Sequence, residues 1–370
     1  MDSNPFFYGG VVKEEFFCNR KNELMELKND IAQGLNILIF APRRFGKTSL
    51  IFKALNGLED EKNIEYIFLD LFTISSKEEF INKYFNEIAK TLHSRAEKIV
   101  KFFKNIVNLR PNINVTFDAQ GNPKFSLNLI GEDIDKTLED VFNSPLKLIK
   151  DKKLVVVFDE FQQINNFQLE NQLRSIIQLH SNKISYIFMG SKKSILQQMF
   201  FDKNRAFYKS VKYFKIGSIE KNEWKSFITV RFHKTQKEIS EDVIDKLLDI
   251  TKGFPYYTQQ FAYEIWNLTE KEATLEIFEK ALRIALEKVE DIFMVEFDNL
   301  TLNQRKALKV VLEKDGENLY DEIVLAKQKI KLSSFQTALK ALIQKDILDK
   351  LKDRYYFQDP LFEYWLKQRL

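Results

Sequence analysis

Residues 41–48 carry the residue types that bind phosphate groups. They read Ala-Pro-Arg-Arg-Phe-Gly-Lys-Thr, which matches the pattern Gly-x-x-x-x-Gly-Lys-Ser/Thr except at the first position, where Ala41 replaces glycine. In such a loop, successive backbone N–H groups and the N-terminus of the next helix surround the phosphates. Gly46 lets the backbone approach them, Lys47 neutralises β- and γ-phosphate charge, and Thr48 offers a hydroxyl to Mg²⁺. The segment therefore predicts a nucleotide site.

The match lies between an apolar run, residues 36–40, and a helical pattern that starts at Ser49. A chance match in a lysine-rich chain is the alternative, but this strand-to-helix junction is the context that the motif requires. The first position mainly eases the turn out of the strand, and alanine is its least costly replacement. The candidate binding residues here are Pro42, Arg43, Arg44, Phe45, Gly46, Lys47, Thr48 and Ser49.

An Asp-Glu pair follows the most hydrophobic run of the chain, residues 154–158. An acidic residue at the C-terminal end of a buried parallel strand lies at the edge where open α/β sheets bind ligands. We expect Asp159 to hold Mg²⁺ through its water shell and Glu160 to polarise an attacking water. A pair that only caps a helix is the structural alternative, and the phosphate-binding segment upstream favours catalysis. Ser191 ends the next predicted strand, where it either orients that water or contacts the γ-phosphate, or belongs to an ordinary turn.

The elements that carry these residues alternate between strands and helices. Apolar runs at 36–40, 64–71, 154–158 and 184–189 are typical of buried parallel strands. Helical patterns lie between them, including one long or two broken helices over residues 77–107. Strands that alternate with helices predict an α/β fold, with a parallel sheet covered by helices on both faces.

Two further patterns divide the rest of the chain. Residues 111–130 alternate polar and apolar side chains around a turn, which predicts a β-hairpin inserted into the core. After about residue 216 the strands are expected to stop, and four helical segments follow. We therefore predict a P-loop core over residues 1–216, a helical lid over 217–298 and a winged-helix domain over 299–370.

The winged-helix prediction depends on three helical segments, a short β candidate at 347–357 and a last helix. Ser333 and Gln336 have the spacing of a capping box at the start of the third helix. Residues 300–370 carry 14 basic and 10 acidic side chains, an excess equal to the net charge of the whole chain, +4. Polar side chains on the third helix favour contact with duplex DNA. The acidic residues beside the wing and the small excess favour a protein partner or an autoinhibitory contact, and both alternatives stay open.

The composition excludes several other classes of protein. A net charge of +4 in 370 residues is too small for a polybasic histone-like or heparin-binding protein, although it does not exclude a local basic face. Cys18 is the only cysteine and the chain has three histidines, which argues against an internal disulfide and against zinc. No apolar run approaches the ~20 residues of a membrane span, and the start lacks the pattern of a signal peptide. We expect a cytoplasmic protein without a membrane segment.

Taken in order, these residues resemble the archaeal-type ATPase family, a branch of the STAND and AAA+ P-loop NTPases. The matching pieces are Asn4-Pro5-Phe6 with Gly9, Phe17-Cys18-Asn19-Arg20-Lys21-Asn22-Glu23-Leu24, Pro42–Leu50, Phe158-Asp159-Glu160-Phe161, Gly190-Ser191, Gly253-Phe254-Pro255 and Tyr356–Phe362. The resemblance covers nearly the full length, which is more specific than the phosphate motif alone.

The resemblance implies further site residues. It places Phe17, Cys18 and Arg20 near an adenine base, although Asn19 stands where the family usually has glycine. It implies that Pro255 closes over the nucleotide. An arginine of the kind that many AAA+ proteins use is not apparent in the lid, which favours a STAND-like switch over a strict AAA+ hydrolysis cycle.

A positive finger just before the last core strand is also implied by the resemblance. Arg205 is the first candidate and Lys209 the second, and a solvated basic loop is the alternative. If Arg205 completes a neighbour's site, the protein forms a homo-oligomer in its ATP state.

Together, the residues and the resemblance imply slow, Mg²⁺-dependent hydrolysis of ATP to ADP and phosphate. The residues and the resemblance are compatible with three functions: a switch that oligomerises with ATP, a DNA-associated motor or loader, and a nucleotide-locked structural protein. The intact Asp159-Glu160 pair argues against the third.

Overall fold

The computed structural model describes residues 3–12, 14–92, 113–149, 152–180, 183–191, 193–351 and 353–370. The chain forms two compact units. The sheet unit contains residues 21–41 and 50–216, and the lid unit contains residues 1–20, 42–49 and 217–370. The part of the predicted helix 77–107 that follows residue 92 lies outside the described residues.

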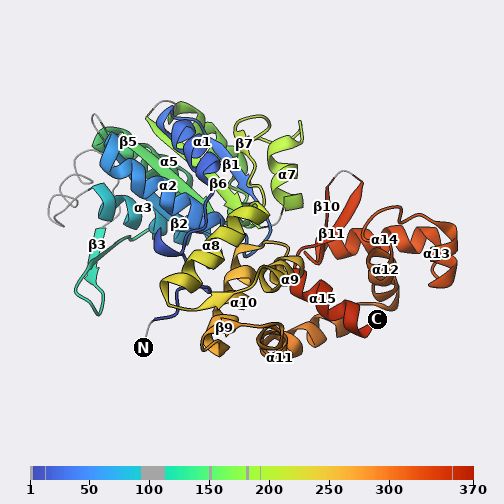
Figure 1. Cartoon of the computed structure of the whole chain (residues 1–370). Coiled ribbons are helices and arrows are strands. Elements are labelled where there is room, and N and C mark those ends of the chain that lie inside the picture. The colour runs from blue at the N-terminus through green and yellow to red at the C-terminus, as the bar shows by residue number, and fades with distance from the viewer. Residues whose placement is uncertain are drawn as a thin grey trace. The chain divides into compact units, whose positions relative to one another are not determined.

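The sheet unit is built on a five-stranded sheet in which all neighbouring strands are parallel (Figure 1). The strands, in spatial order, are β2 (Ile64–Asp70), β5 (Lys153–Asp159), β6 (Ile184–Gly190), β1 (Ile37–Phe40) and β7 (Lys212–Phe214). Every residue of β1 and of β6 is buried, as their unbroken apolar runs predict. The predicted parallel α/β sheet is confirmed.

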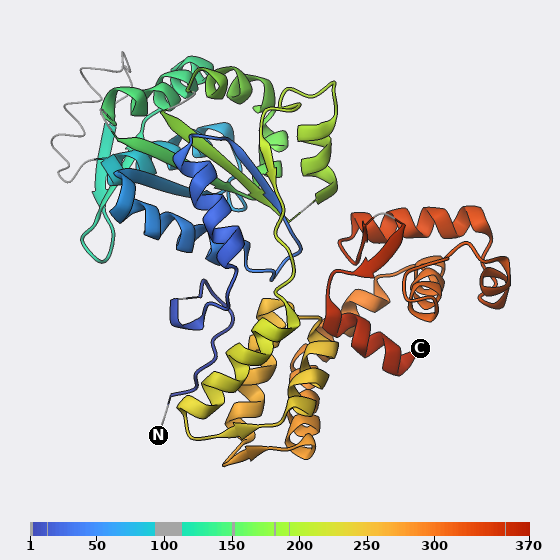
Figure 2. The ribbon, with the colours of Figure 1, turned by 45° about the horizontal axis from the view of Figure 1, so that its top comes forward.

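Helices lie on both faces of this sheet (Figure 2). They are α1 (Lys21–Ala32), α3 (Lys77–Leu92), α5 (Ile134–Leu148), α6 (Glu170–Ile177), α7 (Lys193–Phe201) and α2 (Lys47–Lys62), whose first residues belong to the lid unit. The 3-10 helices η2 (Phe161–Phe167) and η3 (Gln178–His180) come after β5 and before β6 along the chain.

The predicted hairpin is present as β3 (Ile113–Phe117) paired antiparallel with β4 (Pro123–Leu127). Two asparagines of α3 hold it to the core. Asn86 accepts the backbone N–H of Phe125 at 2.9 Å, and Asn82 accepts that of Leu127 at 2.6 Å. Backbone N–H groups on the outer edge of β4 therefore bond to side chains of α3. These bonds hold the hairpin against the sheet unit.

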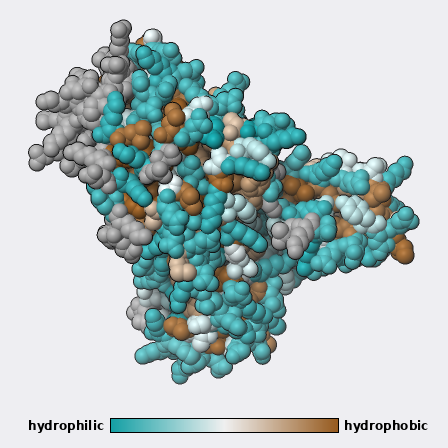
Figure 3. Space-filling view, turned by 90° about the horizontal axis from the view of Figure 1, so that it is seen from above, coloured by the Kyte–Doolittle hydropathy of each residue, from teal (hydrophilic) through white to brown (hydrophobic). Residues whose placement is uncertain are grey.

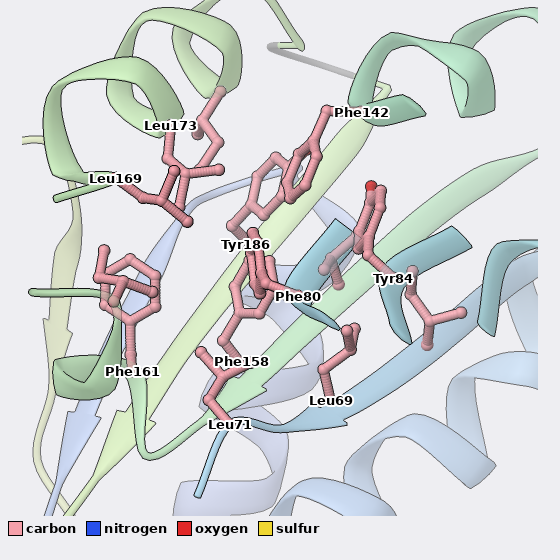
Figure 4. Packing of buried hydrophobic residues seen from close by; sticks show 14 of the residues in the cluster. Leu69, Leu71, Phe80, Tyr84, Phe142, Phe158, Phe161, Leu169, Leu173 and Tyr186 are labelled. Carbon is pink, nitrogen blue, oxygen red and sulfur yellow. The ribbon is translucent and has the colours of Figure 1, made fainter. Parts of the chain in front are cut away.

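An aromatic cluster forms the centre of the sheet unit (Figure 4). Tyr84 stacks on Phe142 with a centroid distance of 3.9 Å, and both rings lie beside Phe158 of β5. Phe161, the first residue of η2, packs on Phe188 of β6 at 4.5 Å. Because the side chain of Phe161 is completely buried, the backbone immediately after β5 is anchored in the core.

The first part of the lid unit is mostly helical, as the sequence predicts. It contains η1 (Glu14–Phe16), α8 (Lys221–Lys234), α9 (Glu241–Thr251), α10 (Pro255–Leu268) and α11 (Leu275–Asp298). The expectation that strands stop after residue 216 is wrong in one detail. Two short strands, β8 (Glu238–Ile239) and β9 (Glu272–Ala273), pair in parallel, and at two residues each they carry no pattern that the sequence could reveal.

The C-terminal part of the lid unit has the order of a winged helix, which confirms that prediction. It contains α12 (Leu302–Glu313), α13 (Glu322–Lys327), α14 (Leu332–Gln344), the antiparallel strands β10 (Leu348–Leu351) and β11 (Arg354–Phe357), and α15 (Pro360–Arg369).

The capping box predicted for the third helix is wrong. Helix α14 begins at Leu332, so Ser333 lies inside its first turn, and the capping residue Lys331 makes no side-chain bond there. A capping box occurs instead on α12, where Thr301 accepts the N–H of Gln304 and Gln304 accepts that of Thr301.

The face of the molecule in Figure 3 is mostly hydrophilic, with apolar residues in separate patches. Among the described residues, no helix combines the length and the apolar character needed to cross a membrane.

Candidate functional site

The phosphate loop, residues 42–49, belongs to the lid unit and follows β1 in the chain. Its backbone has left-handed φ angles at Arg44 (64°) and Gly46 (81°), and α2 begins at Lys47. Gly46 is the residue type that adopts this conformation without strain. Ala41 is outside the left-handed region, so alanine carries no backbone penalty at the position where the motif has glycine. The Nζ of Lys47 lies 3.2 Å from the carbonyl oxygen of Pro42.

A cavity of about 340 Å³ lies beside this loop within the lid unit. Much of its wall is aromatic: Phe7, Tyr8, Phe16, Phe17, Trp224 and Tyr256. The predicted residues Phe17, Arg20 and Pro255 line the same cavity as Gly46, Lys47, Thr48 and Ser49. Cys18 also lines it, and burial raises the pKa of its thiol to about 12. Flat aromatic walls beside a phosphate loop suit a nucleotide base next to its phosphates.

The N-terminal wall of the cavity is fixed by hydrogen bonds to the loop and to α10. Gln259 of α10 accepts the N–H of Phe7 at 3.3 Å and donates to the carbonyl of Phe16 at 2.9 Å. The N–H of Val12 donates to the hydroxyl of Ser49 at 3.2 Å. Gln259 was not predicted from the sequence, since a single glutamine inside a helix carries no motif.

Arg20 lines the cavity and contacts the backbone of the phosphate loop. Its guanidinium donates to the carbonyl oxygens of Gly217 at 2.8 Å and Phe45 at 3.3 Å, and the residue is only 4% exposed. The preceding Asn19 has a φ of 42°, which explains why glycine is favoured there and why asparagine is tolerated. The expected adenine contact of Arg20 stays a prediction; the observed contacts order the loop.

The start of α10 contacts the phosphate loop. Pro255 is its first residue, and the N–H of Tyr256 donates to the carbonyl of Arg44 at 3.4 Å. Gly253 has a φ of 69°, and its carbonyl accepts the indole N–H of Trp224 at 3.0 Å. The Gly-Phe-Pro sequence therefore forms a turn that presents the N-terminus of α10 to the loop, where the helix dipole favours negative charge.

Arg44 extends from the phosphate loop to both other parts of the lid unit. Its guanidinium donates to the hydroxyl of Tyr257 in α10 and lies 3.2 Å from the carboxylate of Asp359. Tyr257 in turn donates to the same carboxylate oxygen. Burial, and then the charge of Asp359, raises the pKa of Tyr257, so its hydroxyl stays protonated and able to donate. We call these three residues the Arg44 triad.

Asp359 also caps the last helix of the winged-helix domain. Its second carboxylate oxygen accepts the N–H groups of Leu361 at 2.9 Å and Phe362 at 3.1 Å. One side chain thus starts α15 and holds Arg44. A second ion pair joins Lys252, which follows α9, to Glu363 of α15. No sequence pattern predicted these contacts.

A separate polar cluster lies at the end of β5 in the sheet unit. Glu160 follows the strand with a φ of 52°, and its N–H donates to Asp159 at 3.0 Å. The Oε2 of Glu160 accepts the hydroxyl of Ser191, which follows β6, at 3.1 Å. It also accepts the amide of Gln162. The structure therefore brings the predicted Glu160 and Ser191 together, and it adds Gln162.

Arg205 is paired inside the sheet unit. Its guanidinium binds Glu170 with two nitrogens, one at 3.1 Å, and donates to the side chain of Asn165 at 2.9 Å. Lys209, the second candidate, lies over the ring of Tyr208 at 5.3 Å. The finger role of Arg205 stays a prediction.

Within the described residues, no group of three or more His, Cys, Asp or Glu side chains suits a metal. A Mg²⁺ ion bound to a nucleotide needs no such group, because it keeps several waters and takes one or two protein ligands besides phosphate oxygens. Thr48 and Asp159 supply the hard oxygen donors that this ion prefers, and their role as ligands stays a prediction.

Two family models match the chain. One describes an ATPase domain predominantly from Archaea and matches residues 17–261; the other describes a probable winged helix domain and matches residues 291–368. A search of curated proteins finds no match.

Solved structures share the fold at low sequence identity. A Walker-type ATPase of Pyrococcus abyssi has a TM-score of 0.66 and 18% identity, covering 96% of this chain and 97% of its own. The ORC2 protein of Aeropyrum pernix, in ADPNP and ADP complexes, has a TM-score of 0.55 and 12% identity, covering 97% and 95%. The ORC1 protein of the same organism, in complex with DNA, has a TM-score of 0.50 and 12% identity, covering 95% and 93%. With the ATPase model matching more than half of its length, the chain belongs to the family of ATPase domains that come predominantly from Archaea.

Proposed function

We propose that the protein binds ATP, hydrolyses it slowly with Mg²⁺, and uses the nucleotide state to switch the conformation of its winged-helix domain. The observation that carries this proposal is the Arg44 triad. Arg44 belongs to the loop that holds the phosphates, and Asp359 belongs to the cap of α15. A γ-phosphate that attracts the guanidinium of Arg44 competes with Asp359 for it, so phosphate occupancy and the position of α15 become coupled.

The hydrolytic roles follow from the residue types and their local geometry. Lys47 and the N-terminus of α2 hold the phosphates, while Arg20 keeps the loop in shape through Phe45. Mg²⁺, held by Thr48 and Asp159, would neutralise the charge that develops on the phosphate oxygens. Glu160 orients the attacking water and accepts its proton, and Ser191 holds the Glu160 carboxylate by a hydrogen bond.

The family membership supports ATP as the nucleotide, and the aromatic cavity supports recognition of its base by Phe17 and the surrounding rings. ADP, the product, occupies the same cavity after hydrolysis. An ATP-state homo-oligomer in which Arg205 reaches a neighbour's site requires the pair with Glu170 to open first.

Duplex DNA is a second candidate partner of residues 299–370. The observation in its favour is the exposed face of α14, which presents Gln336, Thr337 and Lys340. The wing contributes less, because Arg354 is paired with Asp315 and Glu317. A protein partner on the same domain is the competing possibility.

Steady-state ATP hydrolysis, measured with and without duplex DNA, tests both functions. We expect slow turnover in the wild type and only a small residual rate in Glu160→Gln, because glutamine cannot accept the proton of the water. Turnover of wild-type size in Glu160→Gln would contradict the hydrolytic assignment.

The response to DNA distinguishes the switch from the motor or loader. Turnover that duplex DNA raises several-fold, with an affinity that falls steeply as salt rises, would support the DNA function. Turnover indifferent to DNA, with an ATP-analogue-dependent change in elution volume relative to ADP, would support the switch.

A further inference from the structure

Gln162 is a buried polar residue close to the end of β5. It is 5% exposed and is the second residue of η2, directly after Phe161, whose ring is completely buried in the aromatic cluster. This anchor fixes the backbone on one side of Gln162. The side chain therefore has one well-defined place, beside Glu160.

The amide of Gln162 can adopt only one orientation there. Its Nε2 donates to the Oε2 of Glu160, and the opposite orientation would set its carbonyl oxygen against the carboxylate. The consequence is a buried acceptor, because no donor among the described residues reaches the Oε1 of Gln162. An unpaired buried acceptor costs free energy, so this contact is retained at the expense of stability.

Gly190 makes the space for this arrangement. A Cβ built on Gly190 would lie 2.3 Å from the Oε1 of Gln162, so the glutamine side chain would have to move from its place. The glycine that precedes Ser191 thus has a steric role: it lets Gln162 lie against the end of β6, while Ser191, the residue after the strand, donates to Glu160.

The hydrogen bonds to Glu160 converge on one carboxylate oxygen. The hydroxyl of Ser191, its backbone N–H at 3.5 Å and the amide of Gln162 all donate to Oε2, and no hydrogen bond to Oε1 is seen among the described residues. These donors fix the carboxylate in one orientation and leave Oε1 as the oxygen that can accept a proton. A general base gains its efficiency from such fixed geometry.

We propose that Gln162 is a positioning residue for ATP hydrolysis, which acts by holding the Oε2 of Glu160. This inference rests on the proposed hydrolytic function, since it assigns a role through Glu160. The proposal requires that Gln162 contributes to the chemical step of hydrolysis, and not to nucleotide binding or to folding.

Gln162→Leu tests the proposal, because leucine fills similar space and removes both the donor and the unpaired acceptor. We expect kcat to fall at least about tenfold, with the affinity for an ATP analogue within twofold of wild type. The thermal midpoint should be unchanged or higher, since the buried unpaired acceptor is gone. The matched control is Gln163→Leu in the same 3-10 helix, whose side chain bonds Asn166 instead of Glu160.

The Glu160→Gln background separates positioning from a general structural effect. If Gln162 acts through Glu160, adding Gln162→Leu to Glu160→Gln should not lower the residual rate further. The proposal is overturned if Gln162→Leu keeps wild-type kcat, if Gln163→Leu loses as much, or if the two substitutions lower the rate independently. If the Glu160→Gln variant instead hydrolyses ATP as fast as the wild type, the proposed hydrolytic function is itself contradicted, and this proposal with it.

Discussion

The guanidinium of Arg44 lies 3.2 Å from the carboxylate of Asp359, 315 positions further along the chain. The two residues join the predicted phosphate loop to the cap of the last helix. Arg44 is 46% exposed at its side chain, so the ion pair by itself contributes little stability. The proposed switch depends on the position of this charge, because a bound phosphate group would compete with Asp359 for Arg44.

Asp359→Asn should uncouple α15 from the nucleotide. Asparagine caps helices about as well as aspartate, so α15 should persist, while the negative charge that attracts Arg44 is lost. Hydrogen exchange of residues 353–370 measures the effect. We expect the wild type to exchange differently with ADP and with an ATP analogue, and Asp359→Asn to lose most of that difference.

The matched control is Asp321→Asn, which alters the same type of cap on α13, away from the triad. A nucleotide-dependent difference of wild-type size in Asp359→Asn would show that the triad does not transmit the nucleotide state.

Exchanging the charges of Arg205 and Glu170 distinguishes two roles of Arg205. One role is to stabilise the fold through its ion pair with Glu170, and the other is to complete the nucleotide site of a neighbouring subunit. Glu170 is 12% exposed at its side chain, so Arg205→Ala leaves a poorly solvated carboxylate and should destabilise the sheet unit by about 1–3 kcal/mol. The double variant Arg205→Glu/Glu170→Arg should recover part of that loss. Unfolding free energies of the single and double variants measure the coupling.

Hydrolysis by the same variants tests the finger. If Arg205 completes a neighbour's site, the double variant should regain stability but not turnover, even at high protein concentration. Wild-type turnover in Arg205→Ala at high protein concentration would exclude the finger role.

Gly190→Ala should change the position of the Glu160 carboxylate indirectly, through Gln162. The added methyl group would lie 2.3 Å from the Oε1 of Gln162 and 2.9 Å from Leu196, so the glutamine must move. Overpacking of this kind typically costs about 1–3 kcal/mol. We expect lower stability and lower kcat with little change in nucleotide affinity.

Combining Gly190→Ala with Gln162→Ala should restore part of the stability, because the crowded amide is removed, but not the turnover. Turnover of wild-type size in Gly190→Ala would mean that the position of Gln162 does not matter for hydrolysis.

The sequence predicted those features whose cause is local. The phosphate loop follows from the types of residues 42–49 and from the strand and helix on either side, and unbroken apolar runs predicted β1, β5 and β6. The fold class followed from the same alternation of strands and helices.

Contacts between distant residues were not predictable. Tyr257 and Asp359 lie 213 and 315 positions from Arg44, and nothing near any of the three indicates the others. Gln162 was not predicted for another reason: the space that it occupies depends on the absence of a Cβ at Gly190, which lies at the end of β6. The predicted capping box failed because α14 begins at Leu332, one residue before its expected cap.

His180 should make the stability of the sheet unit depend on pH. The residue is completely buried in η3, where its ring nitrogens contact the hydroxyl of Tyr186 at 2.6 Å and the amide oxygen of Asn143 at 2.7 Å. Burial lowers its pKa from 6.5 to about 4. Between these values the unfolded chain binds a proton that the folded chain excludes, so stability falls as pH falls through this window. The expected slope is about 1.4 kcal/mol per pH unit, about 3 kcal/mol in all.

Urea unfolding of the wild type and of His180→Gln between pH 7 and pH 4.5 isolates this contribution, because the carboxylates are common to both. Glutamine keeps a neutral hydrogen-bonding side chain and cannot take up a proton. The difference in unfolding free energy between the two proteins should therefore shift in favour of the variant as the pH falls below about 6.5. A difference that stays constant over this range would mean that His180 is protonated as readily in the folded protein as in the unfolded chain.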